Sequence, residues 1–412
     1  MTRTVEWLDS RIGLNFRPGL ERMERAVAFF KQPQEQYPII HVTGTNGKGS
    51  TIAFLSSLFQ AHGKKVGTFT SPHIVKIQDR IAINGQPISD QDFERLASRL
   101  ADLEESILGE DKFSYFEILC LLAFLYFAQE GVELALIEVG IGGLLDTTNV
   151  VTGELALISS VGLDHQETLG SSLAAIAEQK AGIFKPGKKA LIGPLAEEAE
   201  LVCQKRAEDL GIPLYQYGED FSLIEGAFVS RDYMFDHLSL GLVGAHQEEN
   251  AALALAAFCL FMEEREWPIS ASALRTALEQ TRWAGRLEEV KPRIYLDGAH
   301  NLAALKRLVD FIQEQKVDQV EILFGALKRK DYQAMLTYLK QELPAARLTV
   351  TSFAYGEALE EADVAGLAYR PDYLAYIQDF QEKKEQTSLL FVTGSLYFIS
   401  EVRQALLADG HS

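Results

Sequence analysis

A glycine-rich turn that holds one lysine is the clearest sign of chemistry in this sequence. It follows an apolar run at residues 37–42 and reads Gly44-Thr45-Asn46-Gly47-Lys48-Gly49-Ser50. Glycines let backbone N–H groups face an anion, and the start of the helix predicted after the turn adds a partial positive charge. Lys48 has the charge that β- and γ-phosphates need, and the hydroxyl of Ser50 or Thr51 could reach Mg²⁺. These features predict a nucleotide phosphate loop.

The turn departs from the strict phosphate-loop pattern G-x-x-x-x-G-K-[ST]. Val42 occupies the first glycine position, and Gly49 follows the lysine directly. The plainer alternative is a strand-to-helix turn in which the lysine occurs by chance. The apolar run before the turn and the helical pattern after it favour the phosphate loop, because the motif requires that context.

Three polar side chains follow other predicted strands. Ser71 lies in TSPH, Glu138 in EVGIGG and His165 in GLDHQETLG. In an open parallel sheet, ligands bind beyond the carboxyl ends of the strands. A hydroxyl, a carboxylate and an imidazole at that edge could share a Mg²⁺ ion bound to ATP phosphates. The alternatives are a turn serine before proline, a paired structural carboxylate and a satisfied histidine in a buried turn.

The motifs together resemble a known family. GTNGKGS resembles the phosphate loop of the Mur ligase superfamily, and the glycine after its lysine resembles the folylpolyglutamate synthase and dihydrofolate synthase branch. The serine of TSPH, the glutamate of EVGIGG and the histidine of LDHQETLG match the family's metal-binding positions. The resemblance therefore implies that Ser71, Glu138 and His165 bind the metal. One departure is Leu144, which stands where the bacterial motif often has arginine.

The resemblance also gives roles to two residues that would otherwise be ordinary. Lys180, in AEQKAGIFKPG, lies at the predicted C-terminal end of a helix, where a lysine usually meets the helix dipole or solvent. The matching lysine of the family is carbamylated, which implies a metal-facing carboxylate and a catalytic role for Lys180. Asn250 follows His246 by four residues in GAHQEEN, where both could belong to a helix cap. The family's asparagine contacts the nucleotide.

A second group of candidates lies in the last third of the chain. Arg286 stands in WAGRLE, where it is either a solvated linker charge or an arginine that reaches ATP phosphates. YLDGAHN resembles a family motif that places its aspartate, Asp297, on ATP and its histidine, His300, at the catalytic cleft. Ser395 precedes a predicted helix, where it either caps that helix or helps to hold glutamate. Domain closure would complete the ATP site.

The resemblance extends from the phosphate loop to TGS at residues 393–395 and implies a reaction. ATP would phosphorylate the γ-carboxylate of a tetrahydrofolate, and L-glutamate would attack the acyl phosphate. The segment after TSPH resembles the loop that covers the pterin, so His73 and Arg80 are substrate-side candidates; a charged surface turn is the alternative. Dihydrofolate synthase activity, alone or alongside, stays open. The GKG loop and TSPH disfavour a UDP-sugar peptide ligase, and the number of site residues disfavours a non-catalytic nucleotide switch.

The elements that must position these residues alternate between short apolar strands and longer helices. This alternation predicts an α/β fold with mostly parallel sheets. We expect a phosphate-loop ATP-binding domain with a parallel sheet at residues 1–288. A smaller, Rossmann-like α/β glutamate-ligase domain should follow at residues 289–412. Residues 220–241 alternate and carry aromatics, which predicts a small antiparallel ribbon.

Composition limits the class of protein. A net charge of −19 over 412 residues argues against a broad basic surface for nucleic acid. Cys120, Cys203 and Cys259 lie far apart, which favours buried thiols in a reducing compartment. No apolar run has the length of a signal peptide core or a membrane span, so we expect a cytoplasmic protein without a membrane partner. We also expect a monomer that uses ATP and Mg²⁺, with a monovalent cation as a further cofactor to test.

Overall fold

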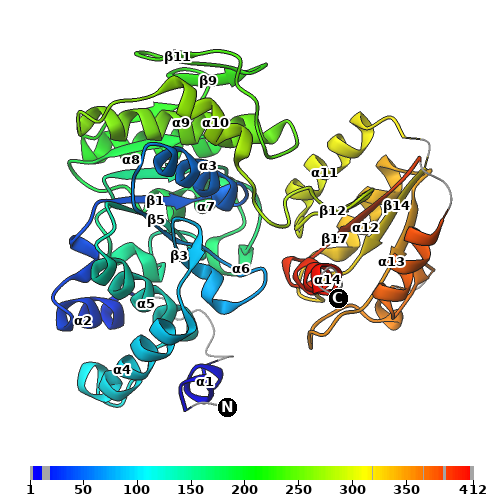
Figure 1. The fold of residues 1–412 in the computed structure, drawn as a ribbon, viewed down its shortest axis with the longest axis horizontal. Helices are drawn as coiled ribbons and strands as arrows, with labels where there is room; N and C mark the ends of the chain where they lie inside the picture. The colour runs from blue at the N-terminus through cyan, green and yellow to red at the C-terminus, as the bar shows by residue number, and fades with distance from the viewer. Residues whose placement is uncertain (1–2, 12–18, 318, 365, 384–386, 409–412) are drawn as a thin grey trace. The chain divides into compact units, whose positions relative to one another are not determined.

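The structure, a computed structural model, describes residues 3–11, 19–317, 319–364, 366–383 and 387–408. The chain forms two compact units, each built of helices around a sheet (Figure 1). The first unit comprises Met1–Gly241 and Gln247–Thr281, and the second comprises Leu242–His246 and Arg282–Ser412. We predicted a division after residue 288, whereas the segment that holds Arg286 belongs to the second unit.

An eight-stranded sheet lies at the centre of the first unit, in the order β4-β3-β2-β5-β1-β6-β7-β8. The strands from β2 to β8 in this order are parallel, and β3 and β4 form an antiparallel hairpin that follows TSPH. The strands are β1 (Ile39–Thr43), β2 (Val66–Phe69), β3 (Ile81–Ile83), β4 (Gln86–Pro87), β5 (Leu134–Glu138), β6 (Leu155–Ile158), β7 (Lys189–Ile192) and β8 (Leu214–Gln216). All residues of β1 and β5 are buried, as expected for central parallel strands.

Helices cover both faces of this sheet. On one face α3 (Lys48–Ala61) packs against α9 (His246–Glu264) and α10 (Ala271–Gln280), with the Phe59 ring 5.0 Å from that of Phe258. The opposite face carries α2 (Glu21–Phe29), α4 (Asp90–Leu108), α5 (Tyr115–Glu130), α7 (Leu173–Ala181) and α8 (Glu197–Leu210). The shorter elements are α1 (Arg3–Asp9), α6 (Gln166–Leu169), η1 (Pro33–Glu35), η2 (Ile77–Arg80) and η3 (Thr147–Val150). The predicted antiparallel ribbon is also present, as β9 (Phe221–Ile224), β10 (Ala227–Ser230) and β11 (Met234–Phe235).

The second unit has a six-stranded sheet in the order β12-β13-β17-β14-β15-β16, in which only β12 is antiparallel to its neighbour. Its strands are β12 (Glu288–Lys291), β13 (Ile294–Leu296), β14 (Gln319–Phe324), β15 (Arg347–Val350), β16 (Ala368–Tyr369) and β17 (Ser388–Thr393). One face packs on α11 (Leu302–Glu314) and α12 (Tyr332–Glu342), and the other on α13 (Tyr373–Glu382) and α14 (Leu396–Ala408), with η4 (Glu361–Asp363) in a loop. The predicted α/β class with two sheets is confirmed.

The structure also bears on two expectations from composition. All three cysteines are buried and none forms a disulfide, as expected. Burial raises the pKa of Cys203 and of Cys259 to about 12, so these thiols stay protonated and unreactive at neutral pH. Among the helices in the described ranges, none combines the length and the hydropathy that crossing a bilayer requires.

Candidate active site

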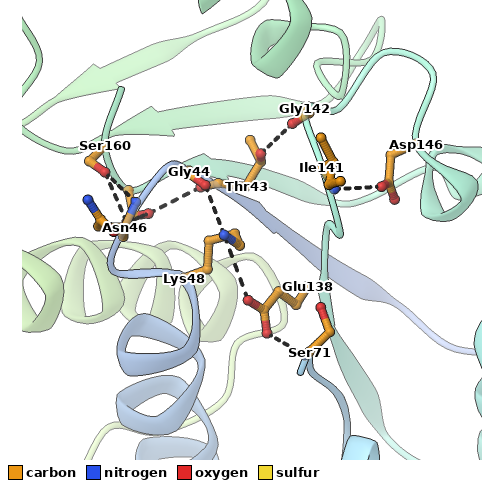
Figure 2. A network of polar contacts seen from close by, with 11 residues as sticks. Thr43, Gly44, Asn46, Lys48, Ser71, Glu138, Ile141, Gly142, Asp146 and Ser160 are labelled. Carbon is orange, nitrogen blue, oxygen red and sulfur yellow. Dashed lines mark hydrogen bonds and ion pairs between the residues drawn. The ribbon is translucent and has the colours of Figure 1, made fainter. Parts of the chain in front are cut away.

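The predicted phosphate loop connects β1 to α3, and residues that follow β6 hold it from one side. The N–H of Thr45 donates to the carbonyl of Ser160 (2.9 Å), and the N–H of Asn46 donates to the Ser160 hydroxyl (2.9 Å). The hydroxyls of Ser159 and Ser160 donate to the Asn46 carbonyl at 2.6 and 3.0 Å (Figure 2). We did not predict a role for either serine from the sequence. Their signal was available, because they are polar residues at the end of a buried parallel strand.

Asn250 lies directly against the loop. Gly47 has a φ of +87°, and a Cβ on Gly47 would lie 2.3 Å from Asn250 Oδ1, so no side chain fits there. The amide of Asn250 is itself held, because its Nδ2 donates to Gln247 Oε1 at 3.0 Å. The structure therefore brings the predicted nucleotide residue to the phosphate loop. His246, which we considered together with Asn250, is grouped with the second unit instead.

Lys48, Glu138 and Ser71 meet at the carboxyl ends of three neighbouring strands. Lys48 Nζ donates to the Gly44 carbonyl (3.0 Å) and lies 3.9 Å from Glu138 Oε1. The other carboxylate oxygen, Oε2, accepts the N–H of Ser71 at 2.9 Å (Figure 2). Glu138 is the last residue of β5 and only 4% exposed. The carboxylate of Glu138 and the hydroxyl of Ser71 are oxygen groups of the kind that Mg²⁺ prefers.

His165, the third predicted metal residue, lies in the loop after β6. Its backbone is left-handed (φ +50°), and its imidazole is 42% exposed. The alternative of a satisfied histidine in a buried turn is therefore wrong, because the turn lies at the surface. Within the described ranges, no three side chains of His, Cys, Asp or Glu lie together as a ready metal site. The metal role of Ser71, Glu138 and His165 remains a prediction.

Lys180 lies one residue before the end of α7, as predicted, yet it meets neither solvent nor a partner. It is 3% exposed, and within the described part of the chain its amine makes no hydrogen bond or ion pair. Burial, followed by the nearby charge of Lys48, lowers the pKa of Lys180 to about 7, against the opposite effect of Asp164 and Asp146. A large fraction of this amine is neutral, and hence nucleophilic, at neutral pH.

The loop after β5 is fixed by an aspartate that our sequence analysis did not single out. Asp146 is 2% exposed and accepts the N–H of Ile141 (2.9 Å) and both the N–H and the hydroxyl of Thr148 (2.9 and 2.6 Å). Burial raises its pKa, while these hydrogen bonds oppose the rise. The Gly142 carbonyl accepts the Thr43 hydroxyl (2.6 Å), so this loop and β1 hold each other in place (Figure 2). Leu144, which replaces the arginine, donates its N–H to the Gln179 carbonyl at 2.7 Å and is 37% exposed.

The two substrate-side candidates after β2 contact each other. Arg80 is 8% exposed and donates its Nε–H to His73 Nδ1 at 3.0 Å. Burial, followed by the Arg80 charge, lowers the pKa of His73 to about 4. His73 is therefore neutral at physiological pH, and because Nδ1 accepts, its proton is on Nε2.

The second unit brings its four candidates to one edge of its sheet. The carboxylate of Asp297 accepts the N–H groups of Leu287 (3.1 Å) and Ala299 (3.0 Å), and burial raises its pKa while the charge of Arg286 lowers it. His300 Nδ1 lies 2.8 Å from the Gly298 carbonyl. The 3%-exposed Ser395 follows β17, the strand parallel to β13. Ser395 Oγ accepts the Tyr397 N–H at 3.2 Å, which supports its alternative role as a cap of α14.

Comparison with known proteins gives a family for this arrangement. The model of the Mur ligase middle domain matches residues 42–258. A dihydrofolate synthase/folylpolyglutamate synthase from Bacillus subtilis is 35% identical over 97% of this chain and 97% of its own length. The chain belongs to the folylpolyglutamate synthase family. The folylpolyglutamate synthase of Lacticaseibacillus casei is a further relative, 34% identical over 98% of both chains.

Solved structures of the folylpolyglutamate synthase family share the whole fold. A complex of such an enzyme with AMPPCP and folate has a TM-score of 0.85 at 30% identity and covers 98% of both chains. A bifunctional folylpolyglutamate synthase/dihydrofolate synthase with Mn, AMPPNP and L-glutamate bound has a TM-score of 0.86 at 28% identity, over 99% of this chain and 98% of the other. The family resemblance predicted from the sequence motifs is confirmed.

Proposed function

We propose that this protein is an ADP-forming ligase that adds L-glutamate to the γ-carboxylate of a tetrahydrofolate or its polyglutamate through an acyl phosphate. One observation carries the proposal: a phosphate loop fixed by β6 lies beside Glu138, with Lys48 between the loop and the carboxylate. Relatives over the full length of the chain bind AMPPCP with folate, and AMPPNP with Mn and L-glutamate.

In the first unit, the phosphate loop would hold the ATP phosphates through its backbone N–H groups. The residues of the loop that would do so are Thr45, Asn46, Gly47, Lys48, Gly49 and Ser50. Ser71, Glu138 and His165 would hold Mg²⁺, and the oxygen-rich, buried carboxylate end of this set fits a hard cation. When bound, the ion supplies positive charge to the phosphates. Lys48 adds its own charge to the transferring phosphoryl group.

Lys180 would act as a carbamate in this site. Carbamylation needs a neutral amine, and the lowered pKa of Lys180 supplies one near pH 7. The modification would also turn a buried cation into a carboxylate, which suits a position facing a metal ion. A carbamylated Lys180 is therefore part of the proposal, and we propose a monovalent cation as a separate cofactor to test.

In the second unit, Arg286 and Asp297 would bind the nucleotide. Within the described residues the guanidinium of Arg286 has no hydrogen-bond or ion-pair partner, so its donors remain available for phosphate. Asn250, against the phosphate loop, would contact the same nucleotide. His73 and Arg80 would bind the folate, and Ser395 would support the incoming glutamate.

The reaction balances in two steps. An oxygen of the folate γ-carboxylate attacks the γ-phosphorus, and the bond to ADP breaks. The amine of L-glutamate then attacks the acyl carbon, inorganic phosphate leaves, and the amine loses a proton. His300 is suited to take that proton. Its Nδ1 faces the carbonyl of Gly298 and so carries the hydrogen, which leaves the lone pair on Nε2.

A second candidate activity is dihydrofolate synthesis. The Bacillus subtilis relative is named for both activities, which favours this addition. In that reaction dihydropteroate would replace the folate as carboxylate donor, and the same phosphate and glutamate residues would serve. We further propose a monomeric, cytoplasmic protein whose partners are small substrates, without nucleic acid or membrane.

The test is ADP release by the purified protein with Mg²⁺-ATP and L-glutamate. Three acceptors are compared: tetrahydrofolate, dihydropteroate and none. Release that needs both glutamate and tetrahydrofolate is the expected result, and a further response to dihydropteroate makes the enzyme bifunctional. If neither tetrahydrofolate nor dihydropteroate increases ADP release above the reaction without acceptor, the proposed substrate is wrong.

A further inference from the structure

Arg286 lies on a tight turn that hydrogen bonds fasten to the second unit. The Gly298 N–H donates to the Gly285 carbonyl (2.9 Å), and the Leu287 N–H donates to Asp297 Oδ2 (3.1 Å). The residues on both sides of Arg286 are thus tied to the end of β13. The turn carries strain, because Leu287 has a φ of +46° and is buried in the core of the unit. A strained turn keeps its shape only where its surroundings hold it.

One ion pair closes this turn. Glu288 Oε2 accepts the N–H of Gly285 at 2.8 Å, so the carboxylate spans the turn that contains Arg286. The same carboxylate is held by Arg403 of α14, whose Nε lies 2.9 and 3.0 Å from its two oxygens. Both side chains are about one-fifth exposed, at 23% for Glu288 and 22% for Arg403. Partial burial and contact with both oxygens give this pair more weight than an exposed one.

The turn also directs the guanidinium. A Cβ on Gly298 would lie 2.7 Å from Arg286 Nη1, so the side chain lies against the backbone of Gly298, which only glycine permits. With its backbone fixed by Glu288 and Asp297, Arg286 has few alternative directions. Its hydrogen-bond donors have no partner among the described residues. A cation held in place before its ligand arrives loses little side-chain freedom on binding.

We propose that Glu288 and Arg403 are positioning residues for Arg286 and act on the nucleotide only through it. The inference rests on the proposed function, because it takes Arg286 to bind ATP. The competing explanation is that the pair merely ties β12 to α14 and stabilises the unit. The two explanations differ in one measurable respect. If the pair positions Arg286, breaking the pair lowers activity only while Arg286 is present.

The experiment is a double-mutant cycle on kcat and KM for ATP, measured by ADP release at saturating glutamate and tetrahydrofolate. The variants are Arg286→Ala, Arg403→Met, Glu288→Gln and the two pairwise combinations with Arg286→Ala. Losing one charged hydrogen-bonding group from a phosphate contact typically costs one to two orders of magnitude. We expect about a 100-fold loss of kcat/KM for Arg286→Ala and about a tenfold loss for Arg403→Met or Glu288→Gln. In the Arg286→Ala background, Arg403→Met should cost less than about twofold.

The matched control is Arg347→Met. Arg347 also pairs with a glutamate of the second unit, at 4.0 Å from Glu321, and lies at the other end of its strand from the candidate site. It should leave kcat/KM unchanged. Thermal melting shows whether Arg403→Met still folds. If it does not, Glu288→Gln and Arg403→Lys replace it in the double-mutant cycle. Arg403→Lys keeps the charge but cannot reproduce the guanidinium geometry, so an intermediate loss is expected.

The outcomes separate the inference from the function. Equal losses from Arg403→Met with and without Arg286 would overturn the positioning role and leave the proposed function standing. An Arg286→Ala variant as active as the parent would overturn the nucleotide role of Arg286 and this inference together. A parent protein without ADP release in the presence of glutamate and either pterin would instead contradict the proposed function itself.

Discussion

Replacing Lys180 by methionine should make the folded protein more stable at neutral pH. The lysine is 3% exposed, and burial lowers its pKa from 10.5 to about 7. In the unfolded chain the amine keeps its ordinary pKa. Between pH 7 and 10.5, therefore, the unfolded state binds a proton that the native state does not, and stability rises with pH across this window. Methionine has a similar volume and no charge, so the variant escapes this cost.

The magnitude follows from the two pKa values. Below about pH 7 both states are protonated, and the full cost of burying the charge is roughly 5 kcal/mol. At pH 7 the expected advantage of the variant is about 4 kcal/mol, and at pH 9 it falls to about 2 kcal/mol, because the remaining cost is that of deprotonating the amine, which falls by about 1.4 kcal/mol per pH unit. These figures are of the order of a domain's whole stability.

Urea titration followed by circular dichroism, at pH 7 and pH 9 in bicarbonate-free buffer without nucleotide, measures this difference. The control is Lys188→Met, which removes a lysine paired with Glu154 at 2.8 Å and should give no such gain. A Lys180→Met variant less stable than the parent at pH 7, or one whose advantage is the same at both pH values, would refute the reasoning.

Turnover should be lost in the Lys180→Met variant. Lys180→Ala should regain part of its turnover with a short carboxylic acid, if a carbamate is the working group.

Four further substitutions address the first unit. Lys48→Ala should abolish ADP release and leave the circular dichroism spectrum unchanged, since its charge serves phosphate; retained turnover would contradict this. Glu138→Ala and His165→Ala should each raise the Mg²⁺ concentration needed for half-maximal activity about tenfold or more, and unchanged metal titrations in both would exclude the metal assignment. Gly47→Ala should weaken ATP binding at least tenfold, because its Cβ would meet Asn250, whereas Gly63→Ala, whose Cβ meets nothing within 4 Å, should bind ATP as the parent does.

The elements with local signals were predictable from the sequence. The phosphate loop lies within one strand–turn–helix segment, and buried strands such as β1 and β5 read as continuous apolar runs. The edge position of Ser71 and Glu138 followed from the rule that ligands gather at the carboxyl ends of parallel strands. The antiparallel ribbon was also predictable, because the alternation of residues 220–241 is a local pattern.

What could not be predicted depends on contacts between distant parts of the chain. The place of Ser160 at the end of a buried strand could be read from the sequence, but its contact with Asn46 spans 114 positions, so its partner could not. The burial of Lys180 depends on how α7 packs against the loop after β5, and from sequence alone it looked like an ordinary helix-end lysine. The exposure of His165 was not predictable either: a buried turn was an open alternative for this residue, whereas its ring is 42% exposed.

The central claim, glutamate ligation through an acyl phosphate, is tested most directly by following a carboxylate oxygen. Tetrahydrofolate is labelled with heavy oxygen in its γ-carboxylate and incubated with the protein, Mg²⁺-ATP and L-glutamate. Mass spectrometry then measures the label in the inorganic phosphate and in the elongated folate. The account predicts one heavy oxygen per phosphate released, because the oxygen that attacks the γ-phosphorus leaves with it. Unlabelled phosphate formed together with an elongated folate would contradict the acyl-phosphate mechanism.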